Sequence, residues 1–253
     1  MRTIQVPICW RHIIIASVLI CAATQGQNLP YLASGALAFN LSIGEVYTPT
    51  NGFTAKTRVE YSDTNSQWSA DFTFCQNGTN ARCDFRVTEF GGPPEQAKQA
   101  LRQLGLDELT ALVNLSSNTL DVISPQLRSY LHIDAPPPLR KVLRLMRQQK
   151  DERVILGDET LDGVQCKRIR IIDRESPDVV ATAWLDVNGG NFPKRIDIVR
   201  GTEHTRIMIV SATLSPPNVD LMRVPDGYTC HTNSVEFLQA ARVAGERVLK
   251  LGN

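Results

Sequence analysis

Cys166 and a small group of acidic residues are the side chains of this chain whose types and spacing could do chemistry. A cysteine thiolate can act as a nucleophile or a metal ligand, and the neighbouring carboxylates of Asp158, Glu159 and Asp162 could act as a general acid and base. These residues surround Asp162-Gly163, a dipeptide typical of two-residue hairpin turns. The sequence therefore predicts antiparallel strands over residues 154–161 and 164–173, with Cys166 in this hairpin and the carboxylates as solvated turn residues.

Other catalytic patterns are absent from the sequence. It has no G-x-S-x-G element, no glycine-rich phosphate loop and no H-E-x-x-H helix. His132, His204 and His231 are scattered singly, as structural or surface histidines usually are. The sequence therefore predicts a protein that is not an enzyme and that needs no cofactor and no metal.

The N-terminus has the charge, length and order of a secretory signal peptide. Basic residues precede an apolar run over residues 13–23, which small residues and a polar break follow. A membrane anchor is the alternative, but this run is shorter than the roughly 20 residues that a spanning helix needs. A lipid-modified Cys21 is a second alternative, although Ile20 stands where such signals have a small residue. The sequence predicts a signal peptide over residues 1–26, and hence a periplasmic or secreted protein that could associate with the outer membrane.

Four cysteines remain after this segment, and an even number in an oxidising compartment favours disulfides. Zinc is the rival, but the spacing lacks paired C-x-x-C elements. The preferred pairing is Cys75 with Cys83 and Cys166 with Cys230, although the strand alternation places Cys75 and Cys83 on opposite faces.

Composition allows a full core and argues against nucleic acid as a partner. The 253 residues are 42% hydrophobic, which is enough for one sizeable domain. Two of the 27 basic residues, Arg2 and Arg11, lie in the N-terminal segment, which leaves 25 basic against 26 acidic residues. A balanced charge gives no electrostatic attraction for nucleic acid.

Alternation of apolar and polar residues predicts about ten strands. Residues 52–62 alternate cleanly, and similar alternation recurs to residue 214, with short turns between the segments. The apolar positions predict one sheet face that helices or a ligand must cover. We expect this face to line a ligand site with Trp68, Phe72, Phe74, Ile169, Ile171, Ile196, Ile198, Ile207 and Ile209.

Three helices interrupt or end this series of strands. Helical spacing of apolar residues is found in residues 91–106, in residues 135–152 and in the tail from Ser234. The middle helix is basic and could lie on an anionic membrane, although its narrow apolar stripe also suits docking on a sheet. The sequence thus predicts a single α+β domain over residues 50–230, dominated by one curved antiparallel sheet, with a lead segment at 27–49 and a C-terminal helix at 231–253.

The order of several short motifs resembles the LolA-like superfamily of bacterial envelope proteins. These are a hairpin segment with Tyr130, an L-G-x-E-x-x-x-G stretch at 156–163, a strand with Trp184 that leads to a proline-started strand, and P-x-G-Y at 225–228. The resemblance implies a half-barrel of antiparallel strands with helices packed on its apolar concave face. It also implies a non-enzymatic exported protein that binds lipid or lipoprotein acyl chains, as in outer-membrane lipoprotein sorting. The alternative is an envelope protein-interaction or sensor module whose core is filled. In both cases Cys166 is a structural residue of the hairpin.

Overall fold

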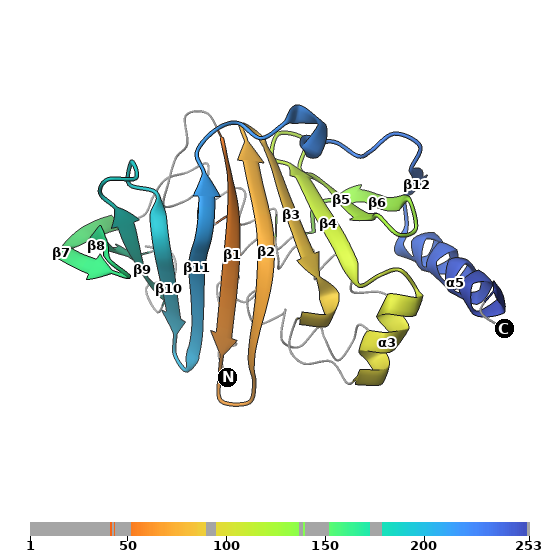
Figure 1. The fold of residues 1–253 in the computed structure, drawn as a ribbon, viewed down its shortest axis with the longest axis horizontal. Helices are drawn as coiled ribbons and strands as arrows, with labels where there is room; N and C mark the ends of the chain where they lie inside the picture. The colour runs from red at the N-terminus through yellow and green to blue at the C-terminus, as the bar shows by residue number, and fades with distance from the viewer. Residues whose placement is uncertain are drawn as a thin grey trace, which may run out of the picture.

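The computed structural model describes residues 41, 43, 52–89, 95–136, 139, 152–172 and 179–251 (Figure 1). The predicted signal peptide and almost all of the predicted lead segment lie outside these residues. The same holds for most of the helix predicted over residues 135–152, of which Leu139 is described as helical and buried.

Twelve strands form one sheet, two more than the sequence predicts. The first six strands are β1 Phe53–Ser62, β2 Gln67–Asn77, β3 Asn80–Arg86, β4 Glu108–Asn114, β5 Thr119–Ser124 and β6 Ser129–Asp134. The last six strands are β7 Glu152–Leu161, β8 Val164–Ile172, β9 Val179–Asp186, β10 Pro193–Arg200, β11 Glu203–Thr213 and β12 Thr229–His231.

The sheet is open and curved, and its order is β12-β6-β5-β4-β3-β2-β1-β11-β10-β9-β8-β7 (Figure 1). Pairing of β1 with β11 joins the two halves of the chain, with Val59 opposite Ile207. The predicted all-antiparallel sheet needs one correction, because β12 pairs with β6 in parallel, Cys230 lying opposite Tyr130. The connection between β11 and β12 is long enough for the chain to reach the edge strand β6. There β12 runs in the same direction as β6.

The β7–β8 hairpin around Cys166 forms as predicted. Asp162 and Gly163 both have positive φ, 50° and 80°, which a two-residue turn of the type I′ requires. β8 follows directly after this turn, and its apolar and charged residues alternate as in a half-buried strand. The local sequence therefore predicts this hairpin.

Two helices and two short 3₁₀ helices complete the described chain: α3 Glu95–Gln103, α5 Ser234–Leu251, η2 Val87–Glu89 and η3 Val219–Met222. Asn233 caps α5, since its Oδ1 accepts a 2.9 Å hydrogen bond from the amide of Glu236. Phe237 of α5 is completely buried, and the helix lies beside β6 and β12 (Figure 1). None of the described helices is long and apolar enough to cross a bilayer.

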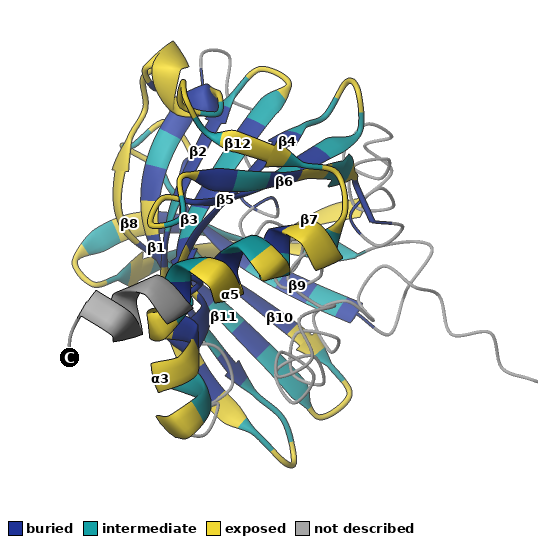
Figure 2. Ribbon diagram, turned by 90° about the vertical axis from the view of Figure 1, so that its right-hand side faces the viewer, coloured by how far each residue is buried: buried dark blue, intermediate teal, exposed yellow. Residues whose placement is uncertain are grey.

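Buried and more exposed residues alternate along the strands, as the alternation of apolar and polar residues predicts (Figure 2). In β1 the odd-numbered residues from Phe53 to Tyr61 are buried and the even-numbered residues are partly or fully exposed. We call the face with Phe53 the inner face and the opposite one the outer face. The inner face carries most of the hydrophobic core.

The predicted disulfides are not formed, and Cys75, Cys83, Cys166 and Cys230 are all free. Cys83 lies opposite Phe74, and Cys75 lies opposite Arg82, so the two thiols are on opposite faces, where their Cβ atoms cannot take up disulfide geometry. Cys166 in β8 and Cys230 in β12 are separated by nine intervening strands of the sheet. The even count of cysteines therefore does not correspond to pairs in this fold.

We expect thiol labelling of the native, unreduced protein to modify Cys230 alone among these four cysteines. Cys230 is exposed and the other three are buried. Burial also raises the pKa of the Cys75, Cys83 and Cys166 thiols, which keeps the reactive thiolate scarce. Peptide mapping by mass spectrometry after alkylation measures this, and denaturation should expose the other three. Resistance of Cys230 until a reductant is added would contradict a free thiol at this position.

Candidate functional site

The nine residues predicted to line a ligand site lie together on the inner face. They come from β2, β8, β10 and β11 and belong to the hydrophobic core or pack against it. Eight are buried and Ile171 is partly buried; the buried residues are Trp68, Phe72, Phe74, Ile169, Ile196, Ile198, Ile207 and Ile209. Their common face is confirmed, whereas their contact with a ligand stays a prediction.

The inner face extends beyond these nine residues. Phe53 contacts Phe74 with ring centroids 5.7 Å apart and Phe192 with centroids 5.1 Å apart, and Tyr61 stacks on Trp68 at 5.5 Å. Small residues lie between the large ones, including Ala181 and Ala183 of β9. The alternation of side chains along β1 and β9 predicts that Phe53, Tyr61, Ala181 and Ala183 point to this face.

Apolar side chains from outside the sheet belong to the same cluster. They include Leu41, Ile43, Leu101, Leu139, Phe237 and Ala241, each buried. Buried polar residues interrupt this apolar surface at Thr57, Gln76 and Thr205. Among the described residues, the side-chain oxygen of Gln76 has no hydrogen-bond partner. These side chains and the inner face of the sheet therefore belong to one hydrophobic core.

A groove of about 490 Å³ on the outer face lies over β1 to β4. Ion pairs line it, with Arg58 Nε 2.8 Å from Asp71 Oδ1 and Arg86 Nη2 2.6 Å from Glu108 Oε1. The hydrogen bond from Arg58 lowers the pKa of Asp71. Because both pairs are exposed to solvent, each contributes little to stability.

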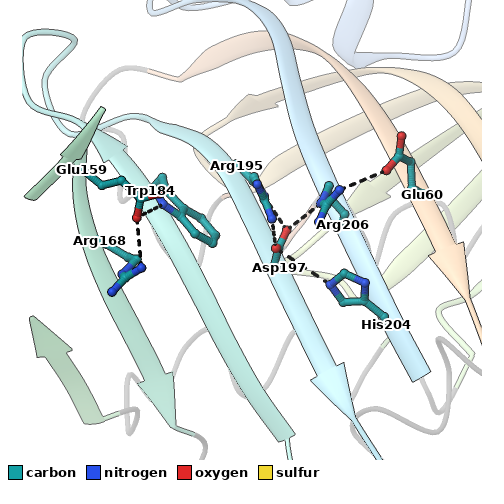
Figure 3. Close-up of polar contacts among 8 residues, drawn as sticks. All are labelled: Glu60, Glu159, Arg168, Trp184, Arg195, Asp197, His204 and Arg206. Atoms are coloured by element: carbon teal, nitrogen blue, oxygen red, sulfur yellow. Dashed lines mark hydrogen bonds and ion pairs between the residues drawn. The ribbon is translucent and has the colours of Figure 1, made fainter. Parts of the chain in front are cut away.

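Asp197 of β10 is the centre of a more buried ion-pair cluster on the outer face (Figure 3). It accepts hydrogen bonds from Arg195, and its Oδ1 lies 3.2 Å from Nε of Arg206. His204 Nε2 lies 3.9 Å from Oδ2, and Arg206 Nη1 lies 3.7 Å from Glu60 Oε2. One carboxylate thus fixes two guanidinium groups.

Glu159 ties the β7–β8 hairpin to this cluster (Figure 3). Its Oε2 accepts from Trp184 Nε1 at 3.1 Å and from Arg168 Nη1 at 3.0 Å. The guanidinium carbon of Arg195 lies 4.5 Å from the Trp184 ring centroid, within cation–π range. Asp158 and Asp162 are exposed, as predicted for solvated residues beside the turn. Glu159 keeps 41% of its side chain exposed but also has partners in β8 and β9, which the sequence did not predict.

The three histidines do not converge. His132 Nδ1 lies 2.6 Å from Asp121 Oδ1, where burial raises the pKa of Asp121, and the ring of His231 contacts Phe237 at 5.9 Å. Within the described residues, no group of three or more His, Cys, Asp or Glu side chains could hold a metal ion.

No protein-family model matches the chain, and no curated protein matches it. Solved structures are similar at low identity. One is an uncharacterized conserved protein from Thermus thermophilus (8% identity, 77% of this chain and 99% of that one, TM-score 0.46). Another is the Mycobacterium tuberculosis lipoprotein LppX (14%, 75% and 98%, TM-score 0.38).

A LolA superfamily protein from Nitrosomonas europaea is also among these structures, at 11% identity over 74% of this chain and 97% of that chain, with a TM-score of 0.38. At these identities and scores nothing about function follows. The open, curved sheet of the chain itself has the architecture that the resemblance of its motifs to the LolA-like superfamily implies.

Proposed function

We propose that this protein is an exported, non-enzymatic binder of lipid or lipoprotein acyl chains, which it holds against the inner face of the sheet. The observation that supports this is the apolar inner face, which continues without a charged residue across Phe72, Val59, Ile207, Ile196 and Ile169 of neighbouring strands. Each methylene of an acyl chain buried there contributes about 0.8 kcal/mol.

The proposal requires helical segments to lie over the inner face as a lid. Leu101, Leu139 and Phe237 come from helical segments and are buried in the core, which supports this requirement. An acyl chain would take the place of some of these apolar side chains, so the inner face of the sheet itself stays shielded from water after the exchange.

A second candidate is an envelope protein-interaction module whose inner face is permanently filled. The complete burial of Leu41, Ile43 and Phe237 in the core favours this candidate. The two candidates differ in one measurable property, which is whether the folded protein takes up an apolar ligand.

We expect the full chain, purified from a bacterial host without detergent, to bind a fluorescent fatty acid saturably. We also expect Ile171→Gln to weaken this binding about tenfold, because loss of the apolar contact removes roughly 1.4 kcal/mol. Ile171 packs against the core on the inner face.

Ile172→Gln is the matched control, since Ile172 follows Ile171 in β8, is equally half-buried and faces the other way. It should leave the affinity unchanged. Native mass spectrometry before and after delipidation provides a second measurement. Absence of copurified lipid together with absence of fatty-acid binding would reject the carrier and favour the filled module.

A further inference from the structure

A small pocket of about 180 Å³ lies on the outer face, between the β7–β8 turn and strands β10 and β11. The turn contributes Leu161 and Asp162. The strands contribute Lys194, Arg195, Arg206, Met208 and Ile209. Three of the lining side chains are basic and only Asp162 is acidic. We call this cavity the β10 bulge pocket.

A β-bulge aims two consecutive basic residues into the pocket. Pro193 lies opposite Leu185 and Arg195 lies opposite Trp184, so Lys194 is an extra residue in β10. Regular alternation would place Lys194 on the inner face with Ile196. The bulge instead lets Lys194 and Arg195 line the same cavity, and such re-aiming of a side chain is a known use of bulges beside binding sites.

The ion pairs hold the two arginines in place without using all their donors. Asp197 accepts from Nε and Nη2 of Arg195 and from Nε of Arg206. A guanidinium has five N–H donors, so both groups keep donors for another acceptor. Asp197 does not line the pocket, and it therefore acts from behind as the group that orients these donors.

Lys194 differs from the other two basic residues of the pocket in its ion pairing. Arg195 and Arg206 are balanced by Asp197 and Glu60, whereas half-buried Lys194 forms no ion pair in the part of the chain that the structure describes. A half-buried ammonium without a counter-ion is unfavourable. An anion in the pocket would remove this cost.

We propose that the β10 bulge pocket binds an oxyanion of the phosphate class through Lys194, Arg195 and Arg206. Fixed arginines and a flexible lysine are the donors that phosphate oxygens prefer. Leu161, Met208 and Ile209 form an apolar wall, which limits hydration and strengthens the charge interaction. The phosphate can be free or belong to a lipid headgroup. Arg195 and Arg206 lie on the outer face, whereas Ile209 also belongs to the inner face, so the pocket shares this one residue with the proposed acyl-chain site. Anion binding does not require acyl-chain binding.

Isothermal titration calorimetry of the full chain at low ionic strength tests this, with two probes. Inorganic phosphate represents the free anion, and dihexanoyl phosphatidylglycerol below its micelle concentration represents a headgroup. We expect saturable one-to-one binding of at least one probe. We expect Lys194→Gln to weaken it about tenfold, the equivalent of one charge-assisted hydrogen bond, and Lys194→Arg to retain it.

Lys56→Gln is the control, because Lys56 lies on the outer face of β1 and does not line this pocket. Binding of phosphate identifies a free anion as sufficient, and binding of the lipid probe alone identifies the headgroup as the source. No saturable binding of either probe to the unmutated protein overturns the proposal. Equal weakening by Lys56→Gln and Lys194→Gln overturns it as well, since it shows general charge attraction.

Discussion

Replacing Phe53 by alanine is expected to lower the free energy of unfolding by about 3–5 kcal/mol, which is typical for loss of a buried phenylalanine. Phe53 is completely buried on the inner face. Its ring contacts Phe74 of β2 and Phe192, which precedes β10. The substitution therefore removes a contact that joins the two halves of the sheet and leaves a cavity between them.

Urea unfolding monitored by circular dichroism measures this effect, with Val199→Ala as the control. Val199 lies on the outer face of β10 and is 43% exposed, so its truncation should change stability by at most about 0.5 kcal/mol. Similar stabilities of Phe53→Ala and Val199→Ala would contradict the packing of Phe53 against Phe74 and Phe192.

Replacing Asp197 by alanine is expected to cost about 2–4 kcal/mol of stability, because two guanidinium groups lose their shared partner in a partly buried site. The Asp197 side chain is only 12% exposed. Without it, Arg195 and Arg206 repel each other, and Arg195 loses the group that holds it over Trp184. We therefore also expect a change in Trp184 fluorescence in the folded variant.

Asp71→Ala is the matched control for Asp197→Ala. Asp71 also pairs with an arginine on the outer face, but its side chain is 59% exposed, and such pairs contribute about 1 kcal/mol or less. Chemical denaturation of both variants at neutral pH gives the comparison. Equal losses would show that burial of the Asp197 cluster has no energetic consequence.

Local patterns in the sequence were sufficient to predict most elements of the fold. The alternation in residues 53–62 predicts β1 and its buried side, because side chains on a strand point to opposite faces in turn. Asp162-Gly163 predicts the β7–β8 hairpin, because few residues accept positive φ at both turn positions. The helical spacing after Ser234 likewise predicts α5.

The candidate site was only partly predictable, and Glu159 and Lys194 show why. A charged residue close to a hairpin turn is normally solvated, and Glu159 is 41% exposed, but it also accepts a hydrogen bond from Trp184, 25 residues further along the chain. Lys194 reaches the outer pocket because an extra residue shifts the register between β9 and β10. A bulge depends on how two strands pair, so no alternation within either strand reveals it.

The cysteines also show which features local sequence predicts and which depend on the tertiary structure. The sequence by itself determined that Cys75 and Cys83 point to opposite faces, that Cys166 lies in a hairpin, and that one face of the sheet is apolar, since each depends on residues near in the chain. Only the tertiary structure decided that β1 pairs with β11, that β12 joins β6 in parallel, and that nine strands lie between Cys166 and Cys230. These features depend on which distant segments bury their apolar faces together, and many pairings satisfy the same local patterns.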